Sequence, residues 1–165
     1  MRLYVMRHGP AEDRASSGRD FDRQLTSSGR ELVQRVAGAF QTARGRREAS
    51  AQPLRILTSP RVRAQETAAI VRSALVPVPR KIETANELGG ETAIPLSLVL
   101  EATTAGVDTL LVGHQPVVED LVKELLGSTP KLLAFSTATV VGLDWTADRG
   151  TWTLTEHLDP SRLPG

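Results

Sequence analysis

The sequence predicts an α/β protein: a three-layer sandwich with a mainly parallel central sheet, helices on both faces and an antiparallel edge strand near the C-terminus. Three observations predict this fold class. Short apolar runs of strand formers alternate with segments of helical periodicity as far as residue 127. The clearest strand candidates end in polar residues. Towards the C-terminus the pattern changes to alternation, which is typical of a hairpin. We expect residues 1–165 to form a single domain.

The first strand candidate is residues 3–6, a continuous apolar run that suits a strand buried on both faces. It leads directly into Arg7-His8-Gly9, and the polar residues 10–23 then predict a long loop beside this stretch. A helix follows, with Thr26 or Ser27 as its N-cap. Its predicted core face has helical spacing and consists of Leu32, Val33, Val36, Ala37, Phe40 and Ala43.

A second strand and helix follow a hydrophilic break. Residues 44–53 are interpreted as a solvated surface loop rather than a nucleic-acid patch, because no aromatic residues interleave with the charges. Residues 54–58 predict a second buried strand. Ser59 then suits an N-cap and Pro60 the first position of a helix, which we expect to continue over residues 61–75.

The third unit of this alternation is less regular. Residues 80–83 predict a brief strand, followed by a loop that holds Glu87. A third helix is expected over residues 94–104, with Leu96, Val99, Leu100 and Thr103 on its apolar side.

The last part of the chain predicts one more strand and helix and then a hairpin. Residues 109–112 form the third clear strand, which ends in Gly113-His114, and residues 117–126 form an amphipathic helix that Gly127 terminates. The hairpin turns at residues 148–150, between the alternating apolar residues Val141, Leu143, Trp145, Trp152 and Leu154. We expect His157 to be structural or exposed and residues 159–165 to be a tail.

Composition excludes several classes of function. Lys and Arg number 20 and Asp and Glu 19, so the net charge of +1 argues against a strongly basic nucleic-acid binder and against electrostatic attachment to membranes. The absence of cysteine excludes disulfides, thiolate zinc sites and Cys nucleophiles. No stretch approaches the ~20 apolar residues of a membrane span, and the first apolar run is too short for a signal peptide. We therefore expect a cytoplasmic protein without nucleic-acid or membrane partners.

Polar residues at three strand ends predict a site. The carboxyl ends of parallel strands meet at one edge of a sheet, so Arg7 and His8, the first turn of the second helix with Arg63, and His114 are expected to converge there. Arginine binds phosphate oxygens bidentately, and a helix N-terminus is itself an anion site. An imidazole beside bound phosphate can act as a general base or as a nucleophile. The sequence thus predicts phosphate chemistry.

These residues resemble the histidine phosphatase (phosphoglycerate mutase-like) superfamily in four motifs that occur in order. Its Arg-His-Gly hallmark matches residues 7–9, and its Leu-Thr-x-x-Gly helix opening matches residues 25–29. The Ser-Pro-x-x-Arg-Ala-x-x-Thr segment matches residues 59–67, and the later Gly-His element matches residues 113–114. The short chain and the Val-Gly-His-Gln-Pro stretch are most similar to the SixA-type phosphohistidine phosphatase branch.

The resemblance implies roles for individual residues. His8 would be the nucleophile that accepts the phosphoryl group, while Arg7, Arg63 and His114 would hold the phosphoryl oxygens. His8 must be neutral to attack, so its second ring nitrogen should donate to a nearby acceptor. No metal and no cofactor are implied. Glu87 has two readings, an acid or a solvated loop carboxylate.

Two further residues complete this comparison. Arg61 lies outside the family spacing and is read as a rim or surface charge. Pro10 departs from the small polar residue that often follows Arg-His-Gly, so one phosphate contact is expected to be missing.

The resulting functional hypothesis is a metal-independent phosphatase that acts on phosphohistidine in a protein partner, such as a histidine-phosphorylated signalling domain. One alternative is a phosphomonoesterase or mutase acting on a small phosphate ester. Another is a non-catalytic domain that binds phosphorylated ligands with the same residues.

Overall fold

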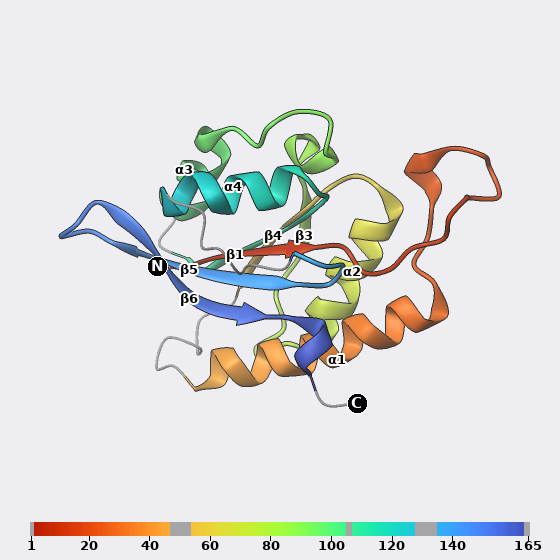
Figure 1. Ribbon diagram of the computed structural model, residues 1–165. Coiled ribbons are helices and arrows are strands. Elements are labelled where there is room, and N and C mark those ends of the chain that lie inside the picture. The colour runs from red at the N-terminus through yellow and green to blue at the C-terminus, as the bar shows by residue number, and fades with distance from the viewer. Residues whose placement is uncertain (1, 47–53, 105–106, 128–134, 164–165) are drawn as a thin grey trace.

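In the computed structural model, which describes residues 2–46, 54–104, 107–127 and 135–163, a central sheet lies between two layers of helices (Figure 1). Its strands in this part of the chain are β1 (Arg2–Arg7), β2 (Arg55–Thr58), β3 (Ile82–Thr84), β4 (Thr109–Gly113), β5 (Val140–Thr146) and β6 (Thr151–Leu158), in the order β3-β2-β4-β1-β5-β6. The pairs β2–β3, β2–β4 and β1–β4 are parallel, whereas β1–β5 and β5–β6 are antiparallel. The predicted α/β sandwich is confirmed.

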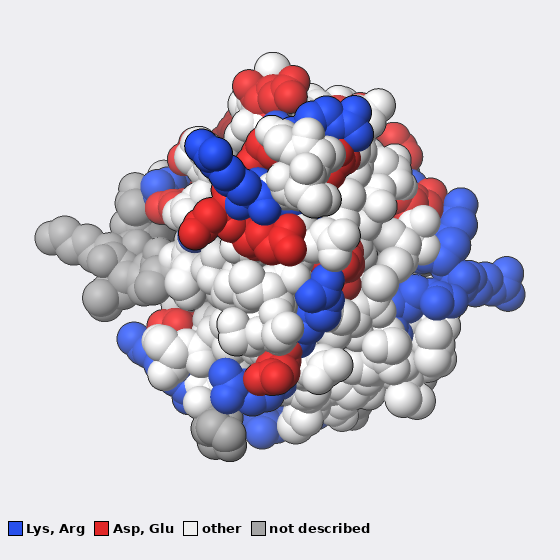
Figure 2. Space-filling view, turned by 90° about the vertical axis from the view of Figure 1, so that its right-hand side faces the viewer, with Lys and Arg blue, Asp and Glu red and all other residues white. Residues whose placement is uncertain are grey.

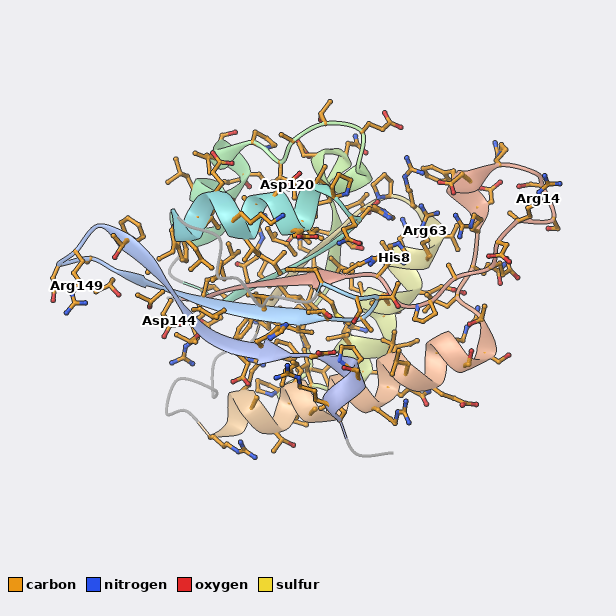
Figure 3. The ribbon with its side chains drawn as sticks, in the orientation of Figure 1. His8, Arg14, Arg63, Asp120, Asp144 and Arg149 are labelled. Atoms are coloured by element: carbon orange, nitrogen blue, oxygen red, sulfur yellow. The ribbon has the colours of Figure 1, made fainter. Side chains whose placement is uncertain are left out.

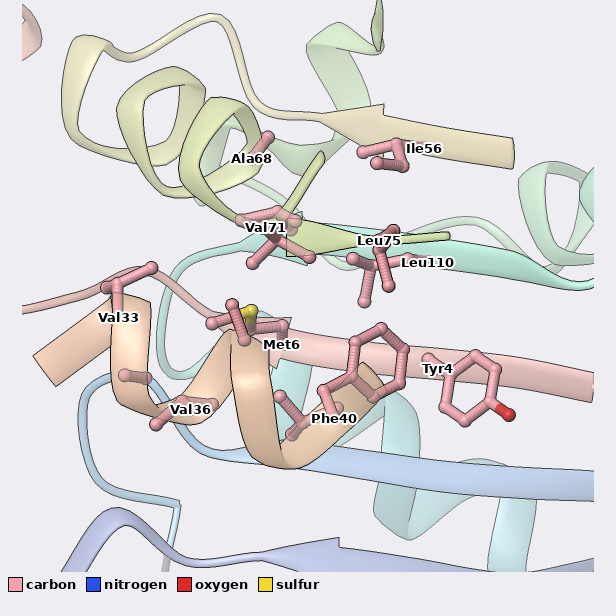
Figure 4. Close-up of a cluster of buried hydrophobic side chains, with 14 of the residues drawn as sticks. Tyr4, Met6, Val33, Val36, Phe40, Ile56, Ala68, Val71, Leu75 and Leu110 are labelled. Atoms are coloured by element: carbon pink, nitrogen blue, oxygen red, sulfur yellow. The ribbon is translucent and has the colours of Figure 1, made fainter. Parts of the chain in front are cut away.

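Helices cover both faces of the sheet. Helices α1 (Ser27–Gly45) and α2 (Val62–Ala74) pack against one face, and α3 (Leu96–Thr104) and α4 (Val117–Leu126) against the other. Alternate residues of β1 belong to two hydrophobic cores, one on each face of the sheet. Tyr4 and Met6 lie in the core under α1 and α2 (Figure 4), and Leu3 and Val5 lie in the core under α3 and α4. A strand with two buried faces needs no polar alternation, which is why its sequence is continuously apolar.

Two helix ends have the capping residues that the sequence predicted, and one does not. Thr26 caps α1 by accepting a hydrogen bond of 2.9 Å from the Gly29 amide, and Gly127 ends α4 with a φ of 64°. Helix α2 begins at Val62, and no side chain caps it. The prediction that Ser59 is its N-cap was wrong, because the Ser59 hydroxyl is engaged by His114 and by the Arg61 amide, which donates to it over 3.2 Å.

Other differences lie at the periphery. Arg44 belongs to the last turn of α1 and is 2% exposed, with its guanidinium 6.0 Å from the Phe40 ring centre, so it is not in a solvated loop. Residues 47–53 of that predicted loop lie outside the described residues. In α3, Val99 is buried as expected, but Leu96 and Leu100 are exposed because this short helix reaches the sheet through one side only.

The C-terminal hairpin is present, and both of its strands run antiparallel to their neighbours. It extends beyond the body of the sheet (Figure 1), with the Trp145 and Trp152 rings 5.4 Å apart and Gly150 at a φ of 60° in the turn. His157 is half-buried in β6. The predicted tail contains a 3-10 helix, η4 (Pro160–Arg162), because the Asp159 carboxylate accepts a hydrogen bond of 3.0 Å from the Ser161 amide.

Phe40 tests the contribution of the α1 side of the core. Its ring is 1% exposed and packs edge-on against Tyr4 at 4.8 Å. We expect Phe40→Ala to lower the free energy of unfolding by about 3–5 kcal/mol, because it leaves a cavity between α1 and the sheet. Phe21→Ala, at a ring that is 46% exposed, should cost less than about 1 kcal/mol. Urea unfolding of both variants measures this, and equal losses would contradict the assigned packing.

Candidate active site

The carboxyl ends of β1, β2 and β4 lie at the same level of the sheet. Arg7 pairs with Gly113 and Thr58 with Val112, which brings the next residue of each strand to one edge. Two backbone bonds extend this alignment past the strands: the His8 amide donates to the Gly113 carbonyl over 3.0 Å, and the Ser59 amide donates to the Val112 carbonyl over 2.9 Å. Strand pairing therefore positions the residues that follow all three strands.

His8 and Arg63 meet at this edge (Figure 3). The His8 Nδ1 atom lies 2.7 Å from the Gly9 carbonyl oxygen, and since a carbonyl only accepts, Nδ1 carries the proton. This leaves Nε2 unprotonated, and its lone pair accepts a hydrogen bond from the Arg63 Nε–H over 3.3 Å. Burial lowers the pKa of His8 to about 4, and the charges of Arg63 and Arg7 act in the same direction. His8 is thus a neutral imidazole with Nε2 unprotonated.

Tight packing holds the His8–Gly9 segment. A side chain at Gly9 would begin 2.4 Å from the Val33 side chain in α1, so only glycine fits there. The Gly9 amide donates over 3.1 Å to the hydroxyl of Thr67, which is fully buried in α2. Gly9 of the first motif and Thr67 of the third motif therefore fix the position of His8.

His114 lies against His8, with the ring centres 4.8 Å apart. Its Nε2 atom is 2.8 Å from the Ser59 hydroxyl, and Nδ1 is buried with no hydrogen-bond partner among the described residues. Burial lowers the pKa of His114 to about 3, with His8 and Arg63 contributing in the same direction. Gly90, at a φ of 89°, packs against this side chain, where a Cβ atom would lie 3.0 Å from the His114 Cβ.

Arg7 is the last residue of β1, directly before His8, and its charge is close enough to His8 to help lower the pKa of that histidine. Its Nη1 atom donates to the Phe135 carbonyl over 2.9 Å, and its Nε atom is buried with no hydrogen-bond partner among the described residues. The four predicted residues Arg7, His8, Arg63 and His114 thus form one group at the sheet edge, which we call the four-residue site. It combines two neutral imidazoles with two guanidiniums, a combination suited to binding an anion next to a nucleophilic nitrogen.

Glu87 lies apart from the four-residue site. It is exposed in the 3-10 helix η3 (Asn86–Gly89) and faces a hollow of about 360 Å³ that Arg55, Glu83 and Glu101 also line. The structure does not bring its carboxylate together with the histidines.

Arg61, in contrast, is not a surface charge. Its side chain is only 18% exposed, and its Nε atom donates to the Gly89 carbonyl over 2.8 Å. Of the two predicted placements, a surface charge is not found because the η3 segment folds back over this side chain, and Arg61 instead lies at the rim of the site, where it contacts Asp20.

Sequence reasoning missed Asp20, in the 3-10 helix η1 (Asp20–Asp22). Its carboxylate contacts Arg63 over 3.1 Å and also Arg61, across more than 40 residues of chain. The one local signal is the spacing of Asp20 and Arg23 just before the first helix, which form an ion pair at 2.8 Å. Figure 2 shows this side of the molecule, where basic and acidic side chains adjoin rather than separate into areas of one sign.

The described part of the chain contains neither a metal-binding group of side chains nor a membrane-spanning helix. Among these residues, no group of three or more His, Cys, Asp or Glu side chains is arranged to hold a metal ion. None of the helices within these ranges has the length and hydropathy needed to cross a bilayer.

Comparison with known proteins places the chain in a family. The model of the histidine phosphatase superfamily (branch 1) matches residues 3–89. An uncharacterized protein of Picosynechococcus sp. is 34% identical over 145 residues, covering 87% of this chain and 84% of that protein.

Two solved structures are similar over nearly the whole chain. The protein histidine phosphatase SixA, solved as a complex with tungstate, is 28% identical with a TM-score of 0.80, and the similarity covers 98% of each chain. A putative phosphohistidine phosphatase SixA from Agrobacterium tumefaciens is also 28% identical, with a TM-score of 0.75 over 96% of this chain and 97% of that one. The chain belongs to the histidine phosphatase superfamily and is SixA-like within it.

Proposed function

We propose that this protein is a metal-independent phosphatase that forms a covalent phosphohistidine at His8 and acts on phosphohistidine carried by a protein partner. The observation that carries this proposal is the unprotonated Nε2 atom of His8, which faces the Arg63 guanidinium. A neutral imidazole nitrogen is a nucleophile, and a guanidinium aimed at the same space binds the oxygens of the group under attack.

In the first step, the Nε2 lone pair of His8 attacks phosphorus. The bond from phosphorus to the leaving nitrogen or oxygen breaks, and that atom keeps the electron pair and takes up a proton from solvent water. Arg63, Arg7 and His114 hold the phosphoryl oxygens, whose negative charge is spread over three equatorial positions in the transition state. The Gly9 carbonyl balances the positive charge that develops on the His8 ring through its contact with Nδ1.

In the second step, a water molecule attacks the phosphorus of the phosphohistidine at His8. The P–N bond breaks, inorganic phosphate leaves and His8 returns to its neutral state. The same guanidiniums serve both steps because the phosphoryl oxygens keep their positions while the entering and leaving groups exchange roles. Glu87 has no part in this mechanism, since it faces a different hollow.

A protein substrate is favoured by the similarity to a protein histidine phosphatase, which extends over 98% of both chains without a large insertion in either. The four-residue site also lies at the carboxyl end of the parallel strands, where His8 is partly exposed and a residue presented on another protein's surface can approach it. Tungstate, present in the SixA complex, is a tetrahedral oxyanion like phosphate.

His8→Ala should reduce turnover by about 10⁴-fold or more, because removal of a nucleophile leaves only binding and electrostatic effects. The expected covalent intermediate is tested by brief reaction with a radiolabelled phosphohistidine protein, followed by a check for acid-labile, base-stable label on the enzyme. His157→Ala, at the half-buried histidine in β6, is the matched control and should retain both turnover and label. Substantial activity in His8→Ala would show that the nucleophile is assigned wrongly.

Substrate class is tested by comparing kcat/KM for a phosphohistidine carrier protein with kcat/KM for sugar and nucleotide monoesters, each with and without EDTA. We expect the protein substrate to be preferred and EDTA to have no effect. A clear preference for a small monoester would favour a phosphomonoesterase or mutase. No turnover and no labelling with any substrate would favour a non-catalytic phospho-ligand binding domain.

The neutral state of His8 is tested by NMR titration of its Cε1–H signal, assigned with a His8→Asn variant. Since burial lowers the pKa to about 4, we expect no inflection near pH 6.5 in the folded protein, whereas in urea the signal should titrate near its ordinary value. Below pH 6.5 the unfolded chain takes up a proton that folded His8 does not, so its contribution makes the protein less stable as the pH falls towards 4. An inflection of His8 between pH 6 and 7 would contradict this environment.

A further inference from the structure

The Asp20 carboxylate lies among three arginines, of which one belongs to the four-residue site and two border it. Its Oδ1 atom accepts from Arg23 over 2.8 Å, and its Oδ2 atom accepts from Arg63 over 3.1 Å and from Arg61. The Asp20 main-chain carbonyl accepts a further bond of 2.8 Å from Arg63. We call Arg23, Arg61 and Arg63 the arginine cluster.

The arginine cluster needs a negative charge. The Arg63 side chain is 8% exposed, Arg61 18% and Arg23 27%, so water screens these like charges poorly. Hydrogen bonds from Arg23 and Arg63, together with the charges of Arg63 and Arg61, lower the pKa of Asp20 to about 2, so this side chain is a carboxylate at neutral pH. Asp20 therefore is the main counter-charge of the cluster, while Glu91, whose side chain is 85% exposed, lies 3.5 Å from Arg61 alone.

The proposed phosphoryl ligand needs the same donors. Arg63 uses Nη1 and Nη2 on Asp20, while its Nε faces His8. A phosphoryl group on His8 would take these N–H groups in the same space, and two anions cannot share them without strong repulsion. The Asp20 side chain is half exposed, and no residue of η1 is buried, so the carboxylate has solvent to move into.

We propose that Asp20 is an internal occupant of the anion pocket, which the phosphoryl group displaces, and that Arg61 and Arg23 belong to this pocket together with Arg63. This inference rests on the proposed role of Arg63 in binding phosphate. Asp20 then sets the affinity of the site for anions: it keeps the arginines ordered and compensated, and it competes with every phosphorylated ligand.

The neighbouring Asp22 provides a matched control. It belongs to the same 3-10 helix and is also held as a carboxylate, by Ser17 over 2.6 Å and by Arg19 over 2.7 Å. Asp20→Asn and Asp22→Asn remove the same charge from the same segment, but only Asp20→Asn removes the occupant of the arginine cluster. If only Asp20→Asn changes phosphate binding, the effect is due to displacement of the Asp20 carboxylate and not to the general loss of one negative charge.

The test is the binding of inorganic phosphate to the full-length protein, measured by calorimetry. We expect Asp20→Asn to bind phosphate about tenfold more tightly than the wild type, and Asp22→Asn to stay within about twofold. Asp20→Ser is measured as well, since it also removes the carboxylate. Unchanged or weaker binding in both Asp20 variants, or equal effects of Asp20→Asn and Asp22→Asn, would overturn the inference.

Thermal unfolding gives a second readout. Without phosphate, the Tm of Asp20→Asn should fall because the arginine cluster loses the carboxylate that contacts all three of its members, and saturating phosphate should raise it by more than it raises the Tm of the wild type. Equal gains in Tm would contradict displacement. A lower kcat without tighter phosphate binding would make Asp20 a proton donor and reject the inference. Tighter phosphate binding in a protein that hydrolyses no substrate would keep this inference and reject the proposed function.

Discussion

The pairing of β4 with β1 on one side and β2 on the other is the constraint on which the site depends. Its register sets Arg7 beside Gly113 and Thr58 beside Val112, so the chain leaves all three strands at one level. A shift of one residue in either pairing would turn side chains to the opposite face of the sheet. Residues separated by more than 100 positions thereby meet within hydrogen-bond distance of one another.

The electrostatics of the site follow from burying cations beside imidazoles. Burial and nearby guanidiniums both favour the neutral form of histidine, so the pKa values of His8 and His114 fall to about 4 and about 3. The guanidiniums cannot lose their charge and instead require an anion. In the structure Asp20 supplies that anion, while the Nε2 atom of His8 stays unprotonated.

Several motif residues act through position rather than chemistry. Gly9 allows the chain after β1 to pass close to Val33 in α1, and the Thr67 hydroxyl in α2 accepts a hydrogen bond from the Gly9 amide. Ser59 contacts His114, and Gly90 packs against the same ring from the η3 side. The SixA-like sequence therefore contains residues that pack around His8 and His114 as well as the two histidines themselves.

The sequence by itself determined the alternation of strands and helices, the closing hairpin, and the placing of Arg7, His8 and His114 at strand ends and of Arg63 at the start of a helix, because apolar periodicity and the ends of strands and helices are local properties. It did not determine that Asp20 joins Arg61 and Arg63, that Ser59 turns to His114 instead of capping α2, or that Glu87 faces another hollow. Those outcomes depend on the path of η1 and η3 over the sheet edge. Only the tertiary structure decided them, since contacts between segments far apart in the chain set the path of a loop.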